Sequence, residues 1–406
     1  MSIENIFSNK THKDVNDIIE KSKSPFFLYD IDSLKKKLRD VTEMNPSFLK
    51  LWYACKANPI SSILNAVIDS DIGIDVASKG ELRQVLKSTT DGSKIICTGP
   101  AKSKEYIEML IERGIGLIVV ESLNQLSWVN ESCKALKKKQ KILLRTQLSL
   151  DYEDPLLGGS SITPFGEDPN GWKTLNMDEY ENIQIMGFHV FQWTNVSSLE
   201  QLHALWVHSI ELLIELSREL NIKLEIIDLG GGLGIPYSND EEEYSYEEVI
   251  NLLNEIKSKY DIPTFWLELG RYIAGPFGYY FTKVVDKKII RGKDLLITEG
   301  GINHISRPAF TGQSFPCKTV KNYHTSKLTT FRVHGSLCTA LDYLGEFELA
   351  SDIRVGDWLV FTQAGAYGFT NSIPYFLCHD LAAEYSILNN KIEQNRQTKT
   401  ADEWLV

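Results

Sequence analysis

The sequence lacks the features that would tie the chain to a membrane or to secretion. Its 406 residues contain no apolar run that approaches the roughly 20 residues of a spanning helix. Residues 1–22 are polar and charged, without the apolar core of a signal peptide. We therefore expect a cytoplasmic protein with no membrane partner.

Long basic runs and paired cysteines are also missing. The formal net charge is -11, which argues against nucleic acid as a partner. No two cysteines form a C-x-x-C pair, so the sequence predicts neither a disulfide framework nor a metal site. The six cysteines are Cys55, Cys97, Cys133, Cys317, Cys338 and Cys378.

Eight short, largely apolar runs alternate with helical stretches through the first two thirds of the chain. Continuous apolar runs are typical of parallel strands that are covered on both faces. The runs are Leu51–Asn58, Gly73–Ser78, Lys94–Gly99, Gly116–Glu121, Lys141–Leu148, Gln184–Phe191, Leu224–Gly230 and Thr264–Arg271. The pattern predicts an α/β fold with a (β/α)₈ TIM-type barrel, and an open doubly wound sheet is the alternative.

The pattern of the sequence changes after Pro276. A bare barrel takes only about 250 residues, so the rest of the chain is long enough for a second domain. Strand-like runs separated by turns then predict a second, antiparallel domain of β-sandwich or barrel-like type. The runs are Gly278–Lys288, Asp294–Glu299, Thr329–His334 and Asp357–Thr362, with Phe26–Tyr29 as an added strand. We expect a barrel over residues 37–276 and a β domain over 1–36 plus 277–406, with little order in the polar tail after Asn389.

Polar residues at the carboxyl ends of barrel strands are the first candidates for chemistry. Lys56 ends the first run, where it is either functional or a solvated strand-end charge. Three glycines follow Asp228, and their N–H groups can hold a phosphate or simply form a tight loop. Glu268 can bind a protonated ring nitrogen or pair with Arg271.

Two further side chains have the same double interpretation. His189 lies near the end of the sixth run, where an imidazole can stack on a flat cofactor or serve as a core histidine. Cys338 lies in the β domain and is an ordinary small apolar residue unless it faces the barrel rim.

Seven segments, in this order, resemble the fold-type III pyridoxal-phosphate decarboxylases, the family of diaminopimelate and ornithine decarboxylases. The segments are YACKANP, GIDVASKGEL, GFHV, DLGGGLG, ELGR, GSLCTALD and GAYG, and the similarity runs from about Phe26 to Tyr385. The resemblance implies a decarboxylase whose cofactor is pyridoxal 5'-phosphate, held by Lys56 as a Schiff base. It also implies a homodimer in which the β domain completes the active site of the partner.

The resemblance assigns roles to individual positions. Asp75 would help to set the charge of Lys56, His189 would stack on the cofactor ring, and Glu268 would bind the pyridine nitrogen. Four residues would hold the phosphate, namely Gly231, Gly232, Arg271 and Tyr367, with Gly270 beside them. Cys338 would enter the partner's site and deliver a proton. The amino-acid-derived substrate would contact Arg307, Cys338, Thr339 and Asp342.

Several positions depart from the family's pattern. Thr339 replaces the Glu of diaminopimelate decarboxylases or the Asp of ornithine decarboxylases, which binds the distal amine of the substrate. Phe191-Gln192-Trp193-Thr194 replaces His-x-Gly-Ser, ELGR replaces EPGR, and Pro164-Phe165-Gly166 lacks a preceding lysine. These departures are similar to the decarboxylases of siderophore and other natural-product pathways, which act on conjugates such as citryl-diaminopropionate or on carrier-bound amino acids.

Three other functions are open. A diaminopimelate or ornithine decarboxylase is disfavoured by Thr339, and an alanine-racemase-like activity by the motif around Cys338. A catalytically silent homologue that regulates a true decarboxylase is the third, and it has no physical need to keep all four of Lys56, His189, Glu268 and Cys338.

Overall fold

A computed structural model describes residues 9–21, 25–89, 91–149, 162–238, 241, 243–321 and 327–405. The chain divides into two compact units. The barrel unit comprises Lys37–Ile235 and Glu242–Ile273. The β unit comprises Met1–Lys36, Pro236–Glu241 and Ala274–Val406. Among the described residues, no helix is both long and apolar enough to cross a membrane.

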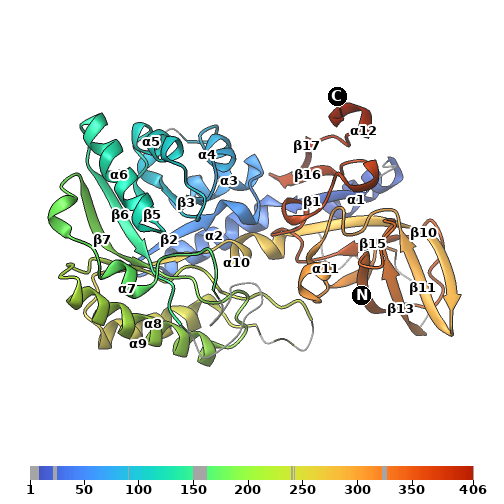
Figure 1. Cartoon of the computed structure of the whole chain (residues 1–406). Helices are drawn as coiled ribbons and strands as arrows, with labels where there is room; N and C mark the ends of the chain where they lie inside the picture. The colour runs from blue at the N-terminus through green and yellow to red at the C-terminus, as the bar shows by residue number, and fades with distance from the viewer. Residues whose placement is uncertain are drawn as a thin grey trace. The chain divides into compact units, whose positions relative to one another are not determined.

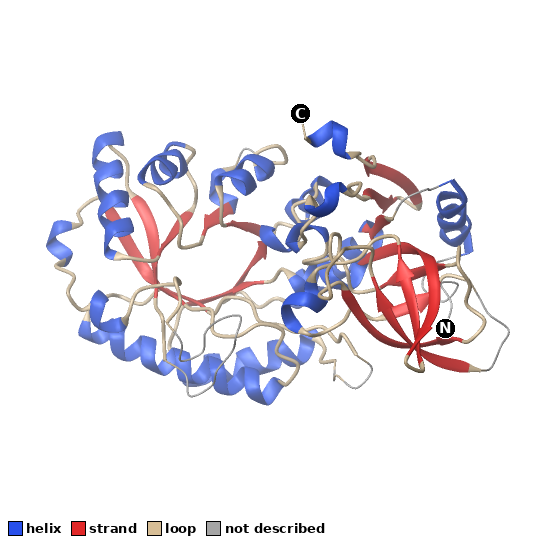
Figure 2. Cartoon of the chain, turned by 45° about the vertical axis from the view of Figure 1, so that its right-hand side comes forward, coloured by secondary structure: helices blue, strands red, loops and turns tan. Residues whose placement is uncertain are grey.

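The barrel unit is built on eight strands that close into a ring, and helices lie outside them (Figure 2). Each strand pairs in parallel with the next, and the last pairs with the first. The strands are β2 (Leu49–Ala54), β3 (Gly73–Val76), β4 (Ile95–Cys97), β5 (Leu117–Val120), β6 (Gln140–Arg145), β7 (Ile183–His189), β8 (Ile226–Asp228) and β9 (Thr264–Glu268). The predicted parallel barrel is confirmed, and the open sheet is wrong.

Serine caps begin several of the helices that surround the barrel. The hydroxyl of Ser78 accepts a hydrogen bond from the backbone N–H of Glu81, which satisfies a donor that the first helical turn leaves unpaired. Ser103 caps the next helix in the same way. The helices are α2 (Ile31–Met44), α3 (Ser61–Asp69), α4 (Lys79–Val85), α5 (Lys104–Glu112), α6 (Leu123–Leu136), α7 (Pro169–Trp172), α8 (Leu199–Glu219), α9 (Tyr246–Lys259) and α10 (Arg271–Ala274).

Large apolar side chains fill the amino-terminal half of the barrel. The rings of Trp52 and Trp266 lie 4.9 Å apart between their centroids, and Leu143 packs in the same cluster. The ammonium group of Lys50 lies 4.3 Å from the Trp52 ring, which places a charge over the aromatic plug. Since this end is closed, the polar side chains of the interior lie toward the carboxyl ends of the strands.

The β unit contains a nine-stranded sheet that is mostly antiparallel, with parallel pairs between β1 and β16 and between β11 and β13 (Figure 1). Phe26 and Phe281 stack at 4.6 Å in its core. The strands are β1 (Phe26–Asp30), β10 (Gly278–Ile290), β11 (Lys293–Thr298), β12 (Cys317–Thr319), β13 (Leu328–His334), β14 (Tyr343–Ala350), β15 (Trp358–Phe361), β16 (Ala383–Leu388) and β17 (Lys391–Arg396). The helices are α1 (Asn9–Lys21), α11 (Arg307–Thr311) and α12 (Ala401–Trp404). The predicted second β domain is confirmed.

Two details differ from the prediction. The first barrel strand ends at Ala54, and Lys56 lies in the 3₁₀ turn η2 (Cys55–Ala57). The tail after Asn389 is ordered, because β17 pairs with β16. Asn389 and Asn390 join these strands with φ angles of 53° and 56°, which asparagine tolerates better than most residues in a tight hairpin turn.

Candidate active site

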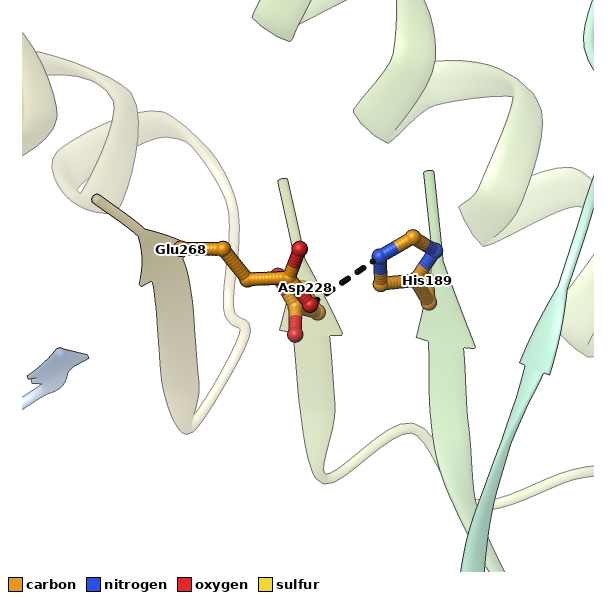
Figure 3. Close-up of side chains that lie close together, drawn as sticks. All are labelled: His189, Asp228 and Glu268. Carbon is orange, nitrogen blue, oxygen red and sulfur yellow. Dashed lines mark ion pairs between the residues drawn. The ribbon is translucent and has the colours of Figure 1, made fainter. Parts of the chain in front are cut away.

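Three buried polar side chains converge at the carboxyl ends of neighbouring strands (Figure 3). His189 is the last residue of β7, Asp228 of β8 and Glu268 of β9. Nε2 of His189 lies 3.3 Å from Oε1 of Glu268, and one polar atom of each of the three residues lies within 4.8 Å of the others. Parallel pairing of adjacent strands brings these residues, far apart in sequence, to the same layer.

Burial changes the protonation of this group. Burial, together with the charge of Glu268, raises the pKa of Asp228 well above its usual range. Burial also raises the pKa of Glu268, but Lys56 and Arg145 oppose that shift. Burial and the charge of Arg145 hold the pKa of His189 well below its usual range. Asp228 and Glu268 therefore keep a proton more readily than ordinary carboxyl groups, and His189 loses its proton more readily than an ordinary imidazole.

Several atoms of this group have no hydrogen-bond partner among the described residues. They are both ring nitrogens of His189, Oδ2 of Asp228 and Oε1 of Glu268. Buried polar atoms are rarely left unpaired in native proteins, so their clustering here indicates a place for a polar ligand. A protonated ring nitrogen fits Oε1 of Glu268, which is what the sequence predicts for this residue.

Lys56 lies in the turn that follows β2, and Asp75 lies in the adjacent strand β3. Lys56 is exposed, although both of its neighbours in the turn are buried. The desolvation of its ammonium group, which its predicted position inside a strand implied, is therefore avoided. Asp75 is buried in β3 and accepts a hydrogen bond of 2.8 Å from the hydroxyl of Thr98. Burial, together with the charge of Glu268, raises the pKa of Asp75 to about 7, while Lys56 lowers it. Asp75 can therefore exchange a proton near neutral pH beside a lysine.

The glycine loop that follows β8 has a backbone that other residues cannot easily adopt. Gly230 and Gly232 have φ angles of 68° and 99°. A side-chain carbon at Gly231 would lie 2.4 Å from the carbonyl oxygen of Glu268. A small recess opens beside the loop, and Gln192 and Gly231 are among its lining residues. Side chains are thus excluded from the loop, as a phosphate site built from backbone N–H groups requires.

Gly270 and Arg271 follow the last barrel strand. A side-chain carbon at Gly270 would lie 2.8 Å from Cβ of Ala57, so glycine lets the end of β9 pack against the turn of Lys56. Arg271 is half-buried and is the first residue of α10 rather than part of the strand. Its role toward a phosphate remains a prediction.

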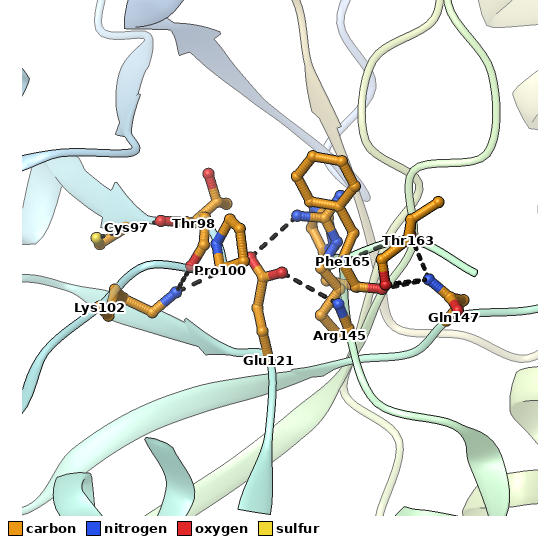
Figure 4. Close-up of polar contacts among 12 residues, drawn as sticks. Cys97, Thr98, Pro100, Lys102, Glu121, Arg145, Gln147, Thr163 and Phe165 are labelled. Carbon is orange, nitrogen blue, oxygen red and sulfur yellow. Dashed lines mark hydrogen bonds and ion pairs between the residues drawn. The ribbon is translucent and has the colours of Figure 1, made fainter. Parts of the chain in front are cut away.

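A second polar cluster at this end of the barrel was missed by the sequence reasoning (Figure 4). Arg145 ends β6, and its guanidinium donates to Oε1 of Glu121 over 3.0 Å. Oε2 of Glu121 accepts the backbone N–H of Gly166 over 3.1 Å. The buried ammonium of Lys102 lies 3.9 Å from Glu121. Glu121 stands at the end of a predicted strand and Arg145 is a charged residue inside the predicted run Lys141–Leu148, and these positions were the available signal.

Phe191 was noted only as a departure from the family's pattern. Its ring centroid lies 5.5 Å from Nζ of Lys56. The same ring approaches Gly230 and Gly231, since added side-chain carbons there would lie 2.5 and 3.3 Å from its edge. An aromatic side chain therefore lies beside both the lysine and the glycine loop.

The remaining predicted residues belong to the β unit. Cys338 is exposed and Thr339 half-buried in the loop between β13 and β14. Asp342, in the same loop, accepts backbone N–H groups from Ile302 and Leu337 over 2.8 and 2.7 Å, so its carboxylate holds the loop together.

Arg307 and Tyr367 lie elsewhere in the β unit. Arg307 is buried at the start of α11, donates to Gln313, and lies 3.9 Å from the centroid of the Tyr237 ring. Tyr367 is half-buried, with a φ angle of 53°. The substrate and phosphate roles of these residues remain predictions.

The chain is similar to known decarboxylases over almost its whole length. It is 25% identical to the L-glutamyl-[BtrI acyl-carrier protein] decarboxylase of Niallia circulans, covering 97% of this chain and 96% of the relative. It is 28% identical to the 2-[(L-alanin-3-ylcarbamoyl)methyl]-2-hydroxybutanedioate decarboxylase of Staphylococcus aureus, covering 87% and 91%. It is 26% identical to the diaminopimelate decarboxylase of Corynebacterium efficiens, covering 88% and 82%.

A solved structure shows the same fold. The diaminopimelate decarboxylase of Helicobacter pylori complexed with L-lysine superposes with a TM-score of 0.85 at 22% identity, covering 96% of this chain and 98% of that one. The family model described as "Pyridoxal-dependent decarboxylase, pyridoxal binding domain" matches residues 31–275. The chain therefore belongs to the pyridoxal-dependent decarboxylases, and it is an amino-acid decarboxylase whose cofactor is pyridoxal phosphate.

Proposed function

We propose that this decarboxylase acts on a conjugated or carrier-bound amino acid, of the type used in siderophore and other natural-product pathways. The observation that carries the proposal is the chemistry of the loop 335–342. Thr339 is neutral, and its hydroxyl accepts the backbone N–H of Leu341 over 3.2 Å. The carboxylate of Asp342 in this loop already accepts hydrogen bonds from two backbone N–H groups. The loop therefore offers no carboxylate to the distal ammonium of a free diamino acid.

Two relatives support the proposal through the substrates that their names state. One acts on a glutamyl group attached to a carrier protein, and the other on an amino acid joined by an amide to a hydroxybutanedioate. In neither substrate is the distal end a free amine. Diaminopimelate decarboxylases show similar identity, so a free diamino acid is the alternative that an experiment must exclude.

The chain's own residues would divide the work. Pyridoxal phosphate, when bound, supplies the electron sink for the bond that breaks as carbon dioxide leaves. Lys56 would hold the cofactor, with Asp75 exchanging a proton beside it. Glu268 would accept a hydrogen bond from the ring nitrogen and keep that nitrogen protonated. Gly231 and Gly232 would hold the phosphate through backbone N–H groups.

We also propose a homodimer with shared sites. Cys338 would then enter the partner's site and return a proton to the substrate carbon after carbon dioxide is lost. Its exposure in the loop between β13 and β14 is compatible with that role.

Carbon dioxide release by cofactor-loaded protein tests the substrate class. The panel holds meso-diaminopimelate, L-ornithine, L-lysine, L-arginine, a citryl-diaminopropionate conjugate and a glutamyl thioester of pantetheine. We expect release from the conjugate or the thioester and at least about 100-fold less from free diamino acids, because a binding site loses such a factor when a charged group stays unpaired. Lys56→Ala should abolish release.

Two results would contradict the proposal. Fast release from meso-diaminopimelate or L-ornithine would make the enzyme a metabolic decarboxylase. Silence across the whole panel, with cofactor bound, would favour a regulatory homologue. Thr339→Asp provides a matched variant, since restoring a carboxylate should raise the rate with L-ornithine relative to the conjugate.

A further inference from the structure

Phe191 continues the inward-facing row of β7 beyond the end of the strand. His189 is the last strand residue, and the backbone N–H of Val190 still donates to the carbonyl of Asp228 over 2.9 Å. Side chains alternate along an extended chain, so His189 and Phe191 share a face while Val190 points outward. Val190 lines the recess beside the glycine loop, which agrees with this alternation. Phe191 therefore stands one layer nearer to the carboxyl-terminal opening than His189.

The phenyl ring lies close to both points at which the cofactor would be held. Nζ of Lys56 lies 5.5 Å from its centroid. A side-chain carbon at Gly231 would lie 3.3 Å from Cε2 of the same ring. The aldehyde carbon and the phosphate arm of pyridoxal phosphate leave adjacent carbons of one pyridine ring. A pyridine attached at both points would therefore lie close to the phenyl ring.

We propose that Phe191, and not His189, is the side chain that stacks on the pyridine ring of the cofactor. The inference rests on the proposed roles of Lys56 and the glycine loop. Aromatic rings in offset-stacked contact lie with centroids about 4.5–7 Å apart, which suits a ring this close to Lys56.

His189 occupies a different place. Its side chain is 1% exposed, and Nε2 points at Glu268 from 3.3 Å. The imidazole therefore borders the carboxylate that would bind the ring nitrogen, below the layer of Phe191. His189 is a positioning residue for Glu268 in this arrangement.

A phenylalanine in place of a histidine as the stacking residue has a chemical consequence. A phenyl ring contributes contact area but cannot donate a hydrogen bond or a proton to the cofactor. The state of the bound cofactor should then not respond to an imidazole titration on its stacked face between about pH 5 and 8.

Cofactor binding to the full-length, cofactor-free protein tests the proposal. Pyridoxal phosphate is titrated into wild type, Phe191→Leu, Phe191→His and Phe48→Leu, and the visible absorbance gives each Kd. Phe48 is a half-buried phenylalanine just before β2, at the opposite end of the barrel, and serves as the matched control. We expect Phe191→Leu to raise Kd by about two- to tenfold, and Phe48→Leu by less than about twofold.

Phe191→His keeps an aromatic ring and reports on contact directly. Its Kd should stay within about twofold of wild type, and its visible spectrum should gain a transition between about pH 5 and 8 that wild type lacks. An unchanged Kd in Phe191→Leu, or no added transition in Phe191→His, overturns the proposal. Borohydride reduction followed by peptide mass analysis shows whether the cofactor is attached to Lys56. It therefore separates a failure of the stacking proposal from a failure of the proposed function. If wild type takes up no cofactor on Lys56, the proposed function itself fails.

Discussion

At the scale of single residues, the site holds two neighbouring buried acids whose pKa values are both raised. Asp228 and Glu268 are both buried at adjacent strand ends, and a pair of close carboxylates cannot both ionise cheaply. Lys56 and Arg145 oppose the rise in the pKa of Glu268, while the backbone N–H of Gly230 and Arg145 oppose the rise in the pKa of Asp228. Of the two, only Glu268 is also stabilised as a carboxylate by Lys56, which suits a residue that would accept a hydrogen bond from the ring nitrogen.

Asp75 makes the stability of the cofactor-free protein depend on pH. Its pKa is raised from 3.8 to about 7 in the folded protein. The folded state therefore binds more protons than the unfolded state over this range, and stability falls as pH rises from about 4 to 7, by up to about 1.4 kcal/mol per pH unit. Asp75→Asn removes this loss. We expect the melting temperature of Asp75→Asn to exceed that of wild type more at pH 7 than at pH 5.

Asp71 supplies the control for this measurement. It is exposed, lies two residues before β3, and pairs with Lys94 over 2.7 Å. Asp71→Asn should change the melting temperature by a similar amount at both pH values. A gap between Asp75→Asn and wild type that does not widen toward pH 7 would mean that Asp75 stays ionised in the folded protein.

The residues that could be predicted from the sequence are those whose types carry chemistry at strand ends. Lys56, His189 and Glu268 were found in this way, and the structure brings them to one end of the barrel. Phe191 was not given a role, because an aromatic residue in an apolar run looks like core. Its importance lies in its distance to Lys56, which depends on pairing between strands far apart in sequence.

At the scale of elements, apolar runs decided what could be predicted. The barrel strands were found because they are buried on both faces. The strand β17 was missed, since its residues are mainly polar and exposed and its order comes from pairing with β16. The strand β16 is in turn held by parallel pairing with β1, which lies more than 350 residues earlier in the sequence. Such pairing leaves no local pattern in the sequence.

The cluster around Glu121 joins three neighbouring strand ends of the barrel. Its carboxylate lies between the buried cations of Lys102 and Arg145. Replacing the carboxylate by an amide would leave two buried charges without their counter-charge, which is more costly than losing a surface pair. We expect Glu121→Gln to lower the free energy of unfolding by about 3–5 kcal/mol, measured by urea denaturation.

Glu131 is the matched control for Glu121. It pairs with Lys104 over 2.8 Å, but both side chains are about half exposed. Glu131→Gln should cost no more than about 1 kcal/mol, because water screens the pair. Equal effects of the two substitutions would mean that solvent reaches the Glu121 cluster.

At the scale of the whole molecule, the fold alone does not decide the substrate. The chain matches carrier-dependent, conjugate-specific and diaminopimelate decarboxylases at 25–29% identity over most of its length. One barrel with one cofactor site thus serves several substrates, and their differences must lie in residues around the cofactor. The proposed dimer places part of that specificity, through the loop of Cys338 and Thr339, on the second subunit.

Active sites shared between subunits can be tested with a dimer that combines two different variant subunits. In a heterodimer of Lys56→Ala and Cys338→Ala subunits, one site combines the intact Lys56 of one chain with the intact Cys338 of the other, while the second site loses both. A heterodimer purified through two different tags should therefore release carbon dioxide at about half the wild-type rate per dimer. The Lys56→Ala homodimer should be inactive, and the Cys338→Ala homodimer should bind cofactor but turn over slowly. If each site were built within one chain, the heterodimer would show no more than half the residual rate of Cys338→Ala, because neither chain would then hold both residues.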